Sequence, residues 1–580
     1  MRPVVNSRVM NPRTAILLFA ASTLFLSAGT LCVLGSGNEA ASPQSQTDSR
    51  LSSTTRMVQV SALVQDKHGD PILGLTKDDF TLLDEKQPQA IQFFSVETNA
   101  IPEHQPDPLP PNTYTNRLAE RAAMPKSVTL ILLDALNTDF SSQEYSRQQV
   151  LRFLGQLEPK DRVGVYTLDY QLHVLHDFTT DSTALLAAVK SYQGKRLPDV
   201  PDSQAHEVDA IPQRLRASGE VEGLTSFLNA TIEREAHFYI YKRVLITANA
   251  LESISRHVGS LPGRKNLIWV SGSFPFNVGY DDPSKLVPAQ IHDQMDFQAN
   301  VNRVVRALNE ANIAIYPVDA RGLMPADSAI QSQYKLRNRN TPATDFSTTD
   351  SPQNITTMSV LADRTGGRIF YGSNDIFEAV RRAIADSRVT YELGYYPQGV
   401  NWDGKFHSIR VSVKSPGAKV RARTGYLAKP ERAITQEERD AFVVAAAYSP
   451  IEATTIGLTA KVRPSDVAGA DRLNVLLRFN PRDLSFQQLD ANWIANAEVV
   501  YAQIDETGKV VDTPNANLKM NFTSERYEEL KQSGISYTTD VPINRRAADL
   551  RIILRDIGSG EIGSVHIPLN DYFPSKNQAH

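Results

Sequence analysis

The stretch V-T-L-I-L-L-D-A-L-N-T at residues 128–138 decides the predicted fold. It opens with an apolar run, interrupted only by Thr129, that ends at Asp134. Such a run is typical of a strand in a parallel sheet that is covered on both faces. Ligands of open α/β sheets bind beyond the carboxyl ends of the strands, so Asp134 and the loop after it mark the first candidate site.

Strands and helices alternate downstream of this stretch. Further strands are predicted at Arg162–Leu168, Asn266–Val270, Ile313–Val318, Arg368–Tyr371 and Val389–Tyr395. Helices are predicted at Thr183–Val189, Ile240–Val258, Gln298–Ala311, Met358–Arg364 and Ile376–Ala385. This alternation predicts an α/β domain over residues 127–396, with a doubly wound, mostly parallel sheet and helices on both faces. Residues 195–222 and 323–353 read as polar insertions into it.

The flanking regions have a different texture. Residues 57–98 predict a small β-module, with period-two alternation at Met57–Gln65 and further short strands after it. Residues 99–126 are rich in proline and predict an extended linker. Residues 397–428 predict a β-hairpin extension with arms Phe406–Lys414 and Lys419–Tyr426. Residues 435–575 predict a capped helix followed by an all-β, sandwich-like domain.

The N-terminus reads as an export signal. Arg2, Arg8 and Arg13 precede an apolar run from Thr14 to about Gly35. Such a segment is a signal peptide when cleaved, or an inner-membrane anchor over residues 14–35 when retained, within a predicted targeting region of residues 1–40. Lipoprotein processing at Cys32 is a third alternative. Residues 41–56 follow as a flexible spacer, and the remaining chain is expected in the periplasm, on the outer surface or secreted.

Composition narrows the possible functions. The 580 residues include 61 Lys and Arg against 65 Asp and Glu, a net charge of −4 that does not favour nucleic acid as a partner. Cys32 is the single cysteine, which excludes a disulfide framework, a zinc–thiolate site, an iron–sulfur cluster and a cysteine nucleophile. An exported chain without cysteine pairs favours a bacterial envelope.

Several segments carry a resemblance to a known family. They are G-L-T-K-D-D-F at 74–80, L-P-G-R-K-N-L-I-W-V-S at 261–271, Y-E-L-G-Y-Y-P at 391–397, D-G-K-F-H at 403–407 and R-T-G-Y at 423–426. Residues 127–396 resemble a von Willebrand factor type A (VWFA) domain, and residues 57–428 resemble the VWFA-related proteins of acidobacteria. The resemblance implies a module for protein binding or adhesion, whose partner is a protein or a cell-surface ligand.

The same resemblance implies a metal-ion-dependent adhesion site, whose first element is D-x-S-x-S after the first strand. Here Asp134 matches, Leu136 stands where the first serine belongs, and Thr138 stands at the second. Asn137 is one place off and could substitute only if the loop shifted. Because Mg²⁺ gives up water reluctantly, each missing protein oxygen weakens its retention.

The other elements of this site are also incomplete. The segment after the strand at 266–270, where an aspartate usually stands, reads Ser271-Gly272-Ser273. The threonine element is either Thr225 or Thr247, and the missing charge could come from Asp139 or Asp281.

We therefore predict a degenerate site at Asp134 and Thr138, with further oxygens from Asn137, Ser271 and Ser273. Mg²⁺ or Mn²⁺ would bind it weakly or not at all. In the alternative interpretation, Asp134 only caps the next helix or hydrogen-bonds the loop.

Motifs for catalysis are incomplete. His173 and His176 are three residues apart in a predicted strand, which places their rings on opposite faces. Residues 259–265 resemble a phosphate loop, but their glycine spacing is short and they precede a strand. Ser271 lacks the G-x-S-x-G setting of a nucleophile. We predict no catalytic residues and no cofactor beyond the weak metal, and the alternative is an envelope hydrolase with an unrecognised active site.

Overall fold

The computed structural model describes residues 57–98, 106–121, 127–158, 161–194, 241–261, 263–272, 288–321, 352–372, 375–386, 388–397, 402–428, 436–466 and 471–573. The chain divides into two units, residues 1–54 and 55–580, and all described residues belong to the second. The predicted export signal, the spacer and the insertion at 195–222 lie outside the described residues, as does the second insertion up to residue 351. Within the described ranges, no helix combines the length and the apolarity needed to cross a membrane.

A five-stranded sheet forms the centre of the α/β part. Its order is β10 (Ile313–Asp319), β9 (Lys265–Ser271), β6 (Thr129–Asp134), β7 (Val163–Leu168) and β8 (Leu172–Thr179). Neighbours from β10 to β7 run parallel, whereas β8 returns antiparallel beside β7. A largely parallel sheet is therefore present at the predicted place, and β8 is an antiparallel edge strand.

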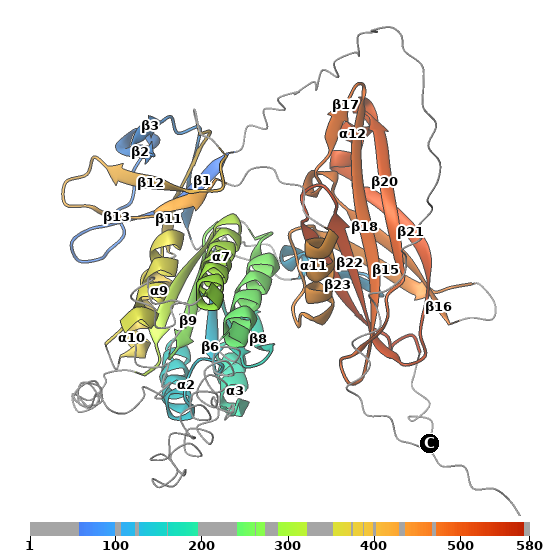
Figure 1. Ribbon diagram of the computed structural model, residues 1–580, viewed down its shortest axis with the longest axis horizontal. Helices are drawn as coiled ribbons and strands as arrows, with labels where there is room; N and C mark the ends of the chain where they lie inside the picture. The colour runs from blue at the N-terminus through green and yellow to red at the C-terminus, as the bar shows by residue number, and fades with distance from the viewer. Residues whose placement is uncertain are drawn as a thin grey trace, which may run out of the picture. The chain divides into compact units, whose positions relative to one another are not determined.

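Helices flank this sheet because its buried strands present apolar side chains on both faces. Leu130 and Leu132 of β6 belong to one core, and Ile131 and Leu133 belong to another. The first core includes the helix at 241–258, α7 (Pro288–Glu310) and α9 (Pro352–Thr365). The second includes α2 (Phe140–Leu154), α3 (Ser182–Ser191) and α10 (Ile376–Ala385) (Figure 1). Successive residues of a strand point to opposite faces, which assigns each core to one face of the sheet.

The last strand predicted for this sheet belongs elsewhere. β11 (Val389–Tyr395) pairs antiparallel with β1 (Val58–Gln65) and β4 (Phe93–Thr98), in a sheet of order β13-β1-β11-β4. The boundary predicted at residue 396 is therefore wrong, and the α/β part ends before β11. Alternation of strands with helices identifies a strand, but it does not say which sheet buries that strand. Arg368–Tyr371 is also reduced, to one parallel bridge between Phe370 and Val318.

A second sheet completes the small β domain, in the order β14 (Gly425–Leu427), β12 (Phe406–Val413), β2 (Phe80–Asp84) and β3 (Gln87–Gln89). Side chains of both sheets share one core, among them Val60, Leu82, Tyr391, Ile409 and Tyr426. The predicted hairpin is split. Of the segments in its second arm, β13 (Lys419–Arg421) pairs with β1, whereas β14 pairs with β12. Residues 57–98 and 388–428 thus form one domain, called here the discontinuous β domain, with the α/β part inserted between its halves (Figure 1).

The C-terminal part is rich in β-structure, as predicted. One sheet has the order β21 (Ile535–Pro542), β16 (Arg472–Phe479), β15 (Leu458–Pro464) and β5 (Thr113–Thr115). The other contains β17 (Gln487–Leu489), β18 (Asn492–Asp505), β22 (Ala547–Asp556) and β23 (Ile562–Pro568), with β19 (Val510–Asp512) and β20 (Asn515–Thr523) also on β18. Strands of both sheets contribute to a single core. Helix α11 (Gln436–Tyr448) begins beside the predicted cap, and α12 (Ser524–Ser533) follows β20.

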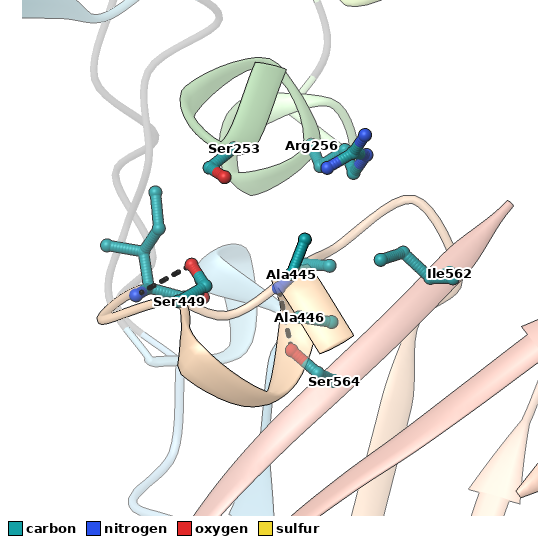
Figure 2. A pocket seen from close by; sticks show the side chains of 9 residues that line it. Ser253, Arg256, Ala445, Ala446, Ser449, Ile562 and Ser564 are labelled. Carbon is teal, nitrogen blue, oxygen red and sulfur yellow. Dashed lines mark hydrogen bonds between the residues drawn. The ribbon is translucent and has the colours of Figure 1, made fainter. Parts of the chain in front are cut away.

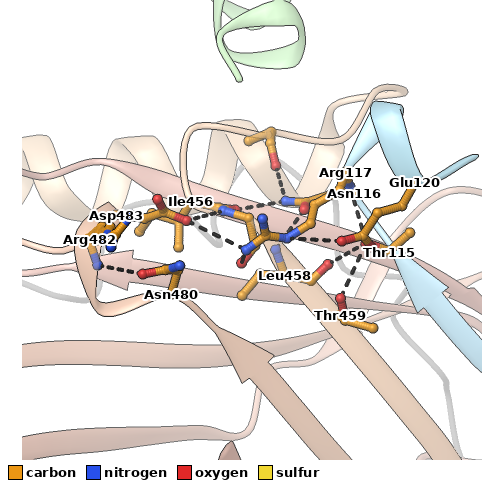
Figure 3. Close-up of polar contacts among 12 residues, drawn as sticks. Thr115, Asn116, Arg117, Glu120, Ile456, Leu458, Thr459, Asn480, Arg482 and Asp483 are labelled. Atoms are coloured by element: carbon orange, nitrogen blue, oxygen red, sulfur yellow. Dashed lines mark hydrogen bonds and ion pairs between the residues drawn. The ribbon is translucent and has the colours of Figure 1, made fainter. Parts of the chain in front are cut away.

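Part of the predicted linker is incorporated into this C-terminal sheet. β5 pairs with β15, and the short helix α1 (Leu118–Arg121) follows it. Asn116 is fully buried, its Nδ2 donates to the carbonyls of Ala453 (2.6 Å) and Ile456 (2.9 Å), and its Oδ1 accepts from the Leu458 amide (2.7 Å) (Figure 3). Residues 113–121 are therefore a structural element and not an extended linker. Proline content predicted extended backbone, but an edge strand is extended too.

Candidate functional site

Asp134 lies at the carboxyl end of β6, and only 3% of its surface is exposed. Its Oδ1 accepts a hydrogen bond from the Asn137 amide (3.0 Å). Its Oδ2 accepts from Asn137 Nδ2 (2.9 Å), Trp269 Nε1 (3.0 Å) and Ser271 Oγ (2.8 Å). The two carboxylate oxygens therefore face four protein donors.

The register of the parallel strands produces this cluster. Leu132 of β6 lies beside Trp269 of β9, so Asp134 and Ser271 are both two residues further along the same faces. The loop after β6 then turns back, because the Asn137 amide hydrogen-bonds the carboxylate three residues earlier. Trp269 is a donor that the D-x-S-x-S pattern does not include. Its place two residues before Ser271 in the buried strand was the available signal.

The structure brings together most of the residues predicted for the adhesion site. Asn137 Nδ2 also donates to Thr247 Oγ1 (3.0 Å), and Thr138 Oγ1 accepts from the Gly272 amide (2.8 Å). Of the two threonines considered for the threonine element, Thr247 is therefore the one that contacts this cluster in the described residues. Thr225, Ser273 and Asp281 lie outside the described residues.

The remaining candidates for the missing charge or ligand point elsewhere. Asp139 caps α2, with its Oδ1 accepting from the Ser142 amide (2.9 Å) and from Ser141 Oγ (2.5 Å). Leu136 is buried in the core of the sheet, with 1% of its surface exposed. Within the described residues, Asp134 is the carboxylate of this cluster.

The donor set does not fit a divalent cation. Mg²⁺ requires lone pairs of several oxygens directed at one point, whereas here N–H and O–H groups already occupy the lone pairs of Asp134. Burial raises the pKa of the Asp134 carboxyl, and the hydrogen bonds from Asn137, Ser271 and Trp269 act against this shift. Neutral donors thus occupy the lone pairs of Asp134 that a cation would need. This arrangement is close to the alternative interpretation, in which Asp134 hydrogen-bonds the loop.

The catalytic alternatives find little support in the described residues. Ser271 is fully buried and donates its hydroxyl hydrogen to Asp134. His173 Nε2 contacts Asp169 Oδ1 (3.0 Å) and His176 Nδ1 contacts the Asp177 carbonyl (2.6 Å), so the two rings serve different partners.

The segment that resembles a phosphate loop also directs its basic groups inward. Arg264 Nη2 donates to the Gly366 carbonyl (2.6 Å), and Lys265 Nζ donates to the Ala311 carbonyl (2.8 Å). Both side chains are almost completely buried. Neither is available to an external phosphate in this structure.

A small pocket elsewhere gathers no acid–base pair. Its lining includes Ser253 and Arg256 of the helix at 241–258, with Ala446, Ile562 and Ser564 across from them (Figure 2). Arg256 already pairs with Glu252 (3.0 Å). Ser564 Oγ accepts from the Ala453 amide (2.9 Å).

One group of potential metal ligands was not predicted. Ligand atoms of Asp84, Glu85 and His407 lie within 4.8 Å of one another in the discontinuous β domain. His407 is 322 positions after Glu85 in the chain, whereas Asp84 and Glu85 are adjacent. Sequence spacing therefore gave no signal for this group.

No protein-family model and no curated protein sequence matches this chain. Among solved structures, an aerotolerance-related membrane protein from Bacteroides fragilis is 10% identical with a TM-score of 0.22, covering 44% of this chain and 98% of that one. The SpRpn10 VWA domain is 13% identical with a TM-score of 0.16, covering 33% and 74%. Three N-terminal domains of the type V pili tip protein Mfa5 from Porphyromonas gingivalis are 9% identical with a TM-score of 0.24, covering 83% and 96%. TM-scores this low do not support a structural relationship. The fold and the candidate site are therefore described from strand order and side-chain geometry alone.

Proposed function

We propose that this chain is an exported envelope protein that binds a protein or a cell-surface ligand through a VWFA-like domain. In this proposal the domain is a doubly wound sheet with a degenerate, metal-independent adhesion site, and the C-terminal part is a sandwich-like support. The signal peptide or anchor at residues 1–40 would deliver it to the periplasm, the outer surface or the medium.

One observation carries the binding proposal. Three exposed aromatic side chains follow the carboxyl ends of the sheet or the bridge beside β10: Phe140 (45% exposed), Tyr170 (44%) and Tyr371 (60%). Carboxyl ends of parallel strands meet at one edge, which is where open α/β sheets bind ligands. Aromatic side chains are enriched at the centres of protein interfaces.

Asp134 also lies at the carboxyl end of a strand of this sheet, but its carboxylate is not directed to an external ligand in this proposal. Asp134 is saturated by internal donors, so its role is to hold the loops after β6 and β9 in place. Contact with a partner then falls to the exposed side chains of Phe140, Tyr170 and Tyr371. This division of roles distinguishes the proposal from a metal-bridged adhesion site.

A pull-down from envelope extract tests the proposal. The bait is the purified chain without the predicted export signal, residues 41–580, called here the ectodomain. We expect a protein or surface polymer to be retained equally with and without EDTA, and to be lost in a Phe140→Ala, Tyr170→Ala, Tyr371→Ala variant. Tyr448→Ala removes a comparably exposed tyrosine (57%) in the C-terminal part and should retain the ligand. Equal retention by the triple variant would contradict the proposed edge.

The alternative function is an envelope hydrolase. Turnover of generic ester, peptide or phosphate substrates by the ectodomain, abolished in Ser271→Ala or His173→Ala, would favour it over the binding proposal. We expect no such turnover, because the Ser271 hydroxyl is buried and hydrogen-bonded to Asp134.

A further inference from the structure

The discontinuous β domain contains a cluster of charged side chains at the end of its core. Asp84 is the last residue of β2, Glu85 follows it in the turn to β3, and His407 lies in the neighbouring strand β12. β2 and β12 pair antiparallel, with Asp84 opposite Ile409, two residues from His407 on the same face. Ligand atoms of the three side chains all lie within 4.8 Å of one another.

Asp84 supplies a buried oxygen without a partner. Only 2% of its surface is exposed, and its Oδ2 accepts hydrogen bonds from the hydroxyls of Tyr395 (2.8 Å) and Tyr426 (3.0 Å). Its Oδ1 is buried and makes no hydrogen bond. Burial and the nearby carboxylate raise the pKa values of both tyrosines, which therefore remain neutral donors. A buried, unpaired carboxylate oxygen is costly unless a cation or a donor meets it.

His407 supplies a second atom of the same kind. Its Nδ1 is buried and makes no hydrogen bond, while its Nε2 lies 3.6 Å from Asp403 Oδ1. The ring packs against Tyr426, with centroids 5.5 Å apart. A ligating histidine commonly directs its second nitrogen at a carboxylate, which fixes the tautomer and orients the ring. Asp403 is in position to do this for His407.

Glu85 supplies a third potential ligand and is the exposed residue of the three. Its φ is +47° and that of Lys86 is +68°, so the tight turn between β2 and β3 holds both in the left-handed region. Its Oε1 accepts from the Ser408 amide (2.5 Å), and this bond lowers the pKa of the exposed Glu85 carboxyl. The carboxylate is thus directed toward β12.

Nearby cations do not neutralise Asp84 directly. Arg423 donates to the Gln59 carbonyl, and the Lys405 ammonium lies 3.4 Å from Asp403. No ion pair joins Asp84 to a basic side chain within the described residues, and the His407 imidazole lies beside the two carboxylates. Asp84 Oδ1 and His407 Nδ1 are both buried without a hydrogen-bond partner, and a bound metal ion would supply a positive partner for atoms of this kind.

We propose that Asp84, Glu85 and His407 bind one divalent transition-metal ion of the Zn²⁺ class, with Asp403, Tyr395 and Tyr426 orienting the ligands. A mixed imidazole and carboxylate set suits Zn²⁺ better than Mg²⁺, and three protein ligands leave a position for water. The ion joins a ligand of the first half of the discontinuous β domain to one of the second half. It would stabilise the contact between these two halves, which the α/β part separates in sequence.

Calorimetric titration of ZnCl₂ into the full chain, purified without a polyhistidine tag and stripped with EDTA, tests the proposal. We expect one Zn²⁺ per chain and a rise in Tm on binding. Asp84→Asn and His407→Gln should abolish both effects, and exposed Glu85→Gln should weaken binding at least tenfold. Asp403→Asn should also weaken it, by about 10–100-fold. Co²⁺ in place of Zn²⁺ should give a visible d–d absorption that disappears in His407→Gln.

Two matched variants keep the result interpretable. Asp134→Asn alters the predicted adhesion site, and His566→Gln removes a histidine that lies 2.9 Å from Asp549 in the C-terminal part; both should bind Zn²⁺ as the native chain does. Circular dichroism identifies any variant that fails to fold, in which case the exposed Glu85→Gln variant decides. Absence of stoichiometric Zn²⁺ binding, or equal binding by folded His407→Gln or Glu85→Gln, would overturn the proposal.

Discussion

At the scale of single residues, Asp134 shows how internal hydrogen bonds can occupy a carboxylate at the end of a strand. The sequence predicted the carboxylate at the strand end and the incomplete ligand set around it. It could not predict that Trp269, Asn137 and Ser271 would all donate to that carboxylate, because hydrogen bonding depends on side-chain geometry. Asp134 and its donors form a closed polar network in a buried place.

Removing this carboxylate should destabilise the protein. Asp134→Ala leaves the donors of Asn137, Trp269 and Ser271 buried without their acceptor, and we expect a loss of about 3 kcal/mol or more in the free energy of unfolding. Urea denaturation measures it. Asp139→Ala is the control, since loss of its exposed helix cap should cost only about 1 kcal/mol. Equal losses in the two variants would show that the network contributes little.

The same saturation predicts weak metal binding at Asp134. Titration of MgCl₂ or MnCl₂ into the ectodomain should give weak binding or none, because protein donors occupy the carboxylate lone pairs. Asp134→Ala should leave the titration unchanged. Micromolar binding that disappears in this variant would show an intact adhesion site and make the proposed ligand interaction metal-dependent.

Lys265 predicts a pH dependence of stability. It is 4% exposed, and burial lowers its pKa to about 8, with the Glu392 charge acting in the opposite direction. Between pH 8 and 10.5 the unfolded chain binds more protons than the folded chain, so this residue's contribution to stability rises with pH. The rise amounts to about 3 kcal/mol when integrated over the window. Urea unfolding at pH 7.5 and 10 should show it in the native chain and not in Lys265→Met.

At the scale of elements, the sequence predicted strands better than their partners. The alternation in Val389–Tyr395 correctly indicated a strand, but its buried Tyr391, Leu393 and Tyr395 contact the core of the discontinuous β domain. The proline-rich segment at 99–126 likewise gave no sign of β5. Because β5 is an edge strand, it needs backbone hydrogen bonds on one side alone. Period-two patterns report which side chains are buried, and several sheets can bury the same strand.

Asn116 tests whether the segment after β5 is structural. Asn116→Ala removes three hydrogen bonds to backbone groups of Ala453, Ile456 and Leu458 in a fully buried place. We expect a loss of about 2–4 kcal/mol in the free energy of unfolding. Asn517→Ala, on an exposed face of β20, should change stability by less than about 0.5 kcal/mol. A flexible linker would instead tolerate both substitutions.

At the scale of the whole molecule, the discontinuous β domain makes the chain's two distant segments interdependent. A protease site introduced into residues 99–105 should be cut without releasing the N-terminal fragment, because β1 pairs with β11 and β13, and β2 pairs with β12. Size-exclusion chromatography should show co-elution of the two fragments. Val60→Asp, which buries a charge in the shared core, should release the fragment. Separate elution of the unsubstituted fragments would contradict the domain assignment.

The sequence by itself determined the α/β centre, the β-rich flanks and the position of Asp134, because these depend on local periodicity and on buried apolar runs. Only the tertiary structure decided that β11 leaves the parallel sheet, that β5 joins the C-terminal sheet, and that Asp84 meets His407. Strand partners, and clusters of residues that are distant in the sequence, depend on which surfaces bury one another. The spacing of residues hundreds of positions apart does not predict this. The donors around Asp134 belong to the same class, since only folding places β9 beside β6.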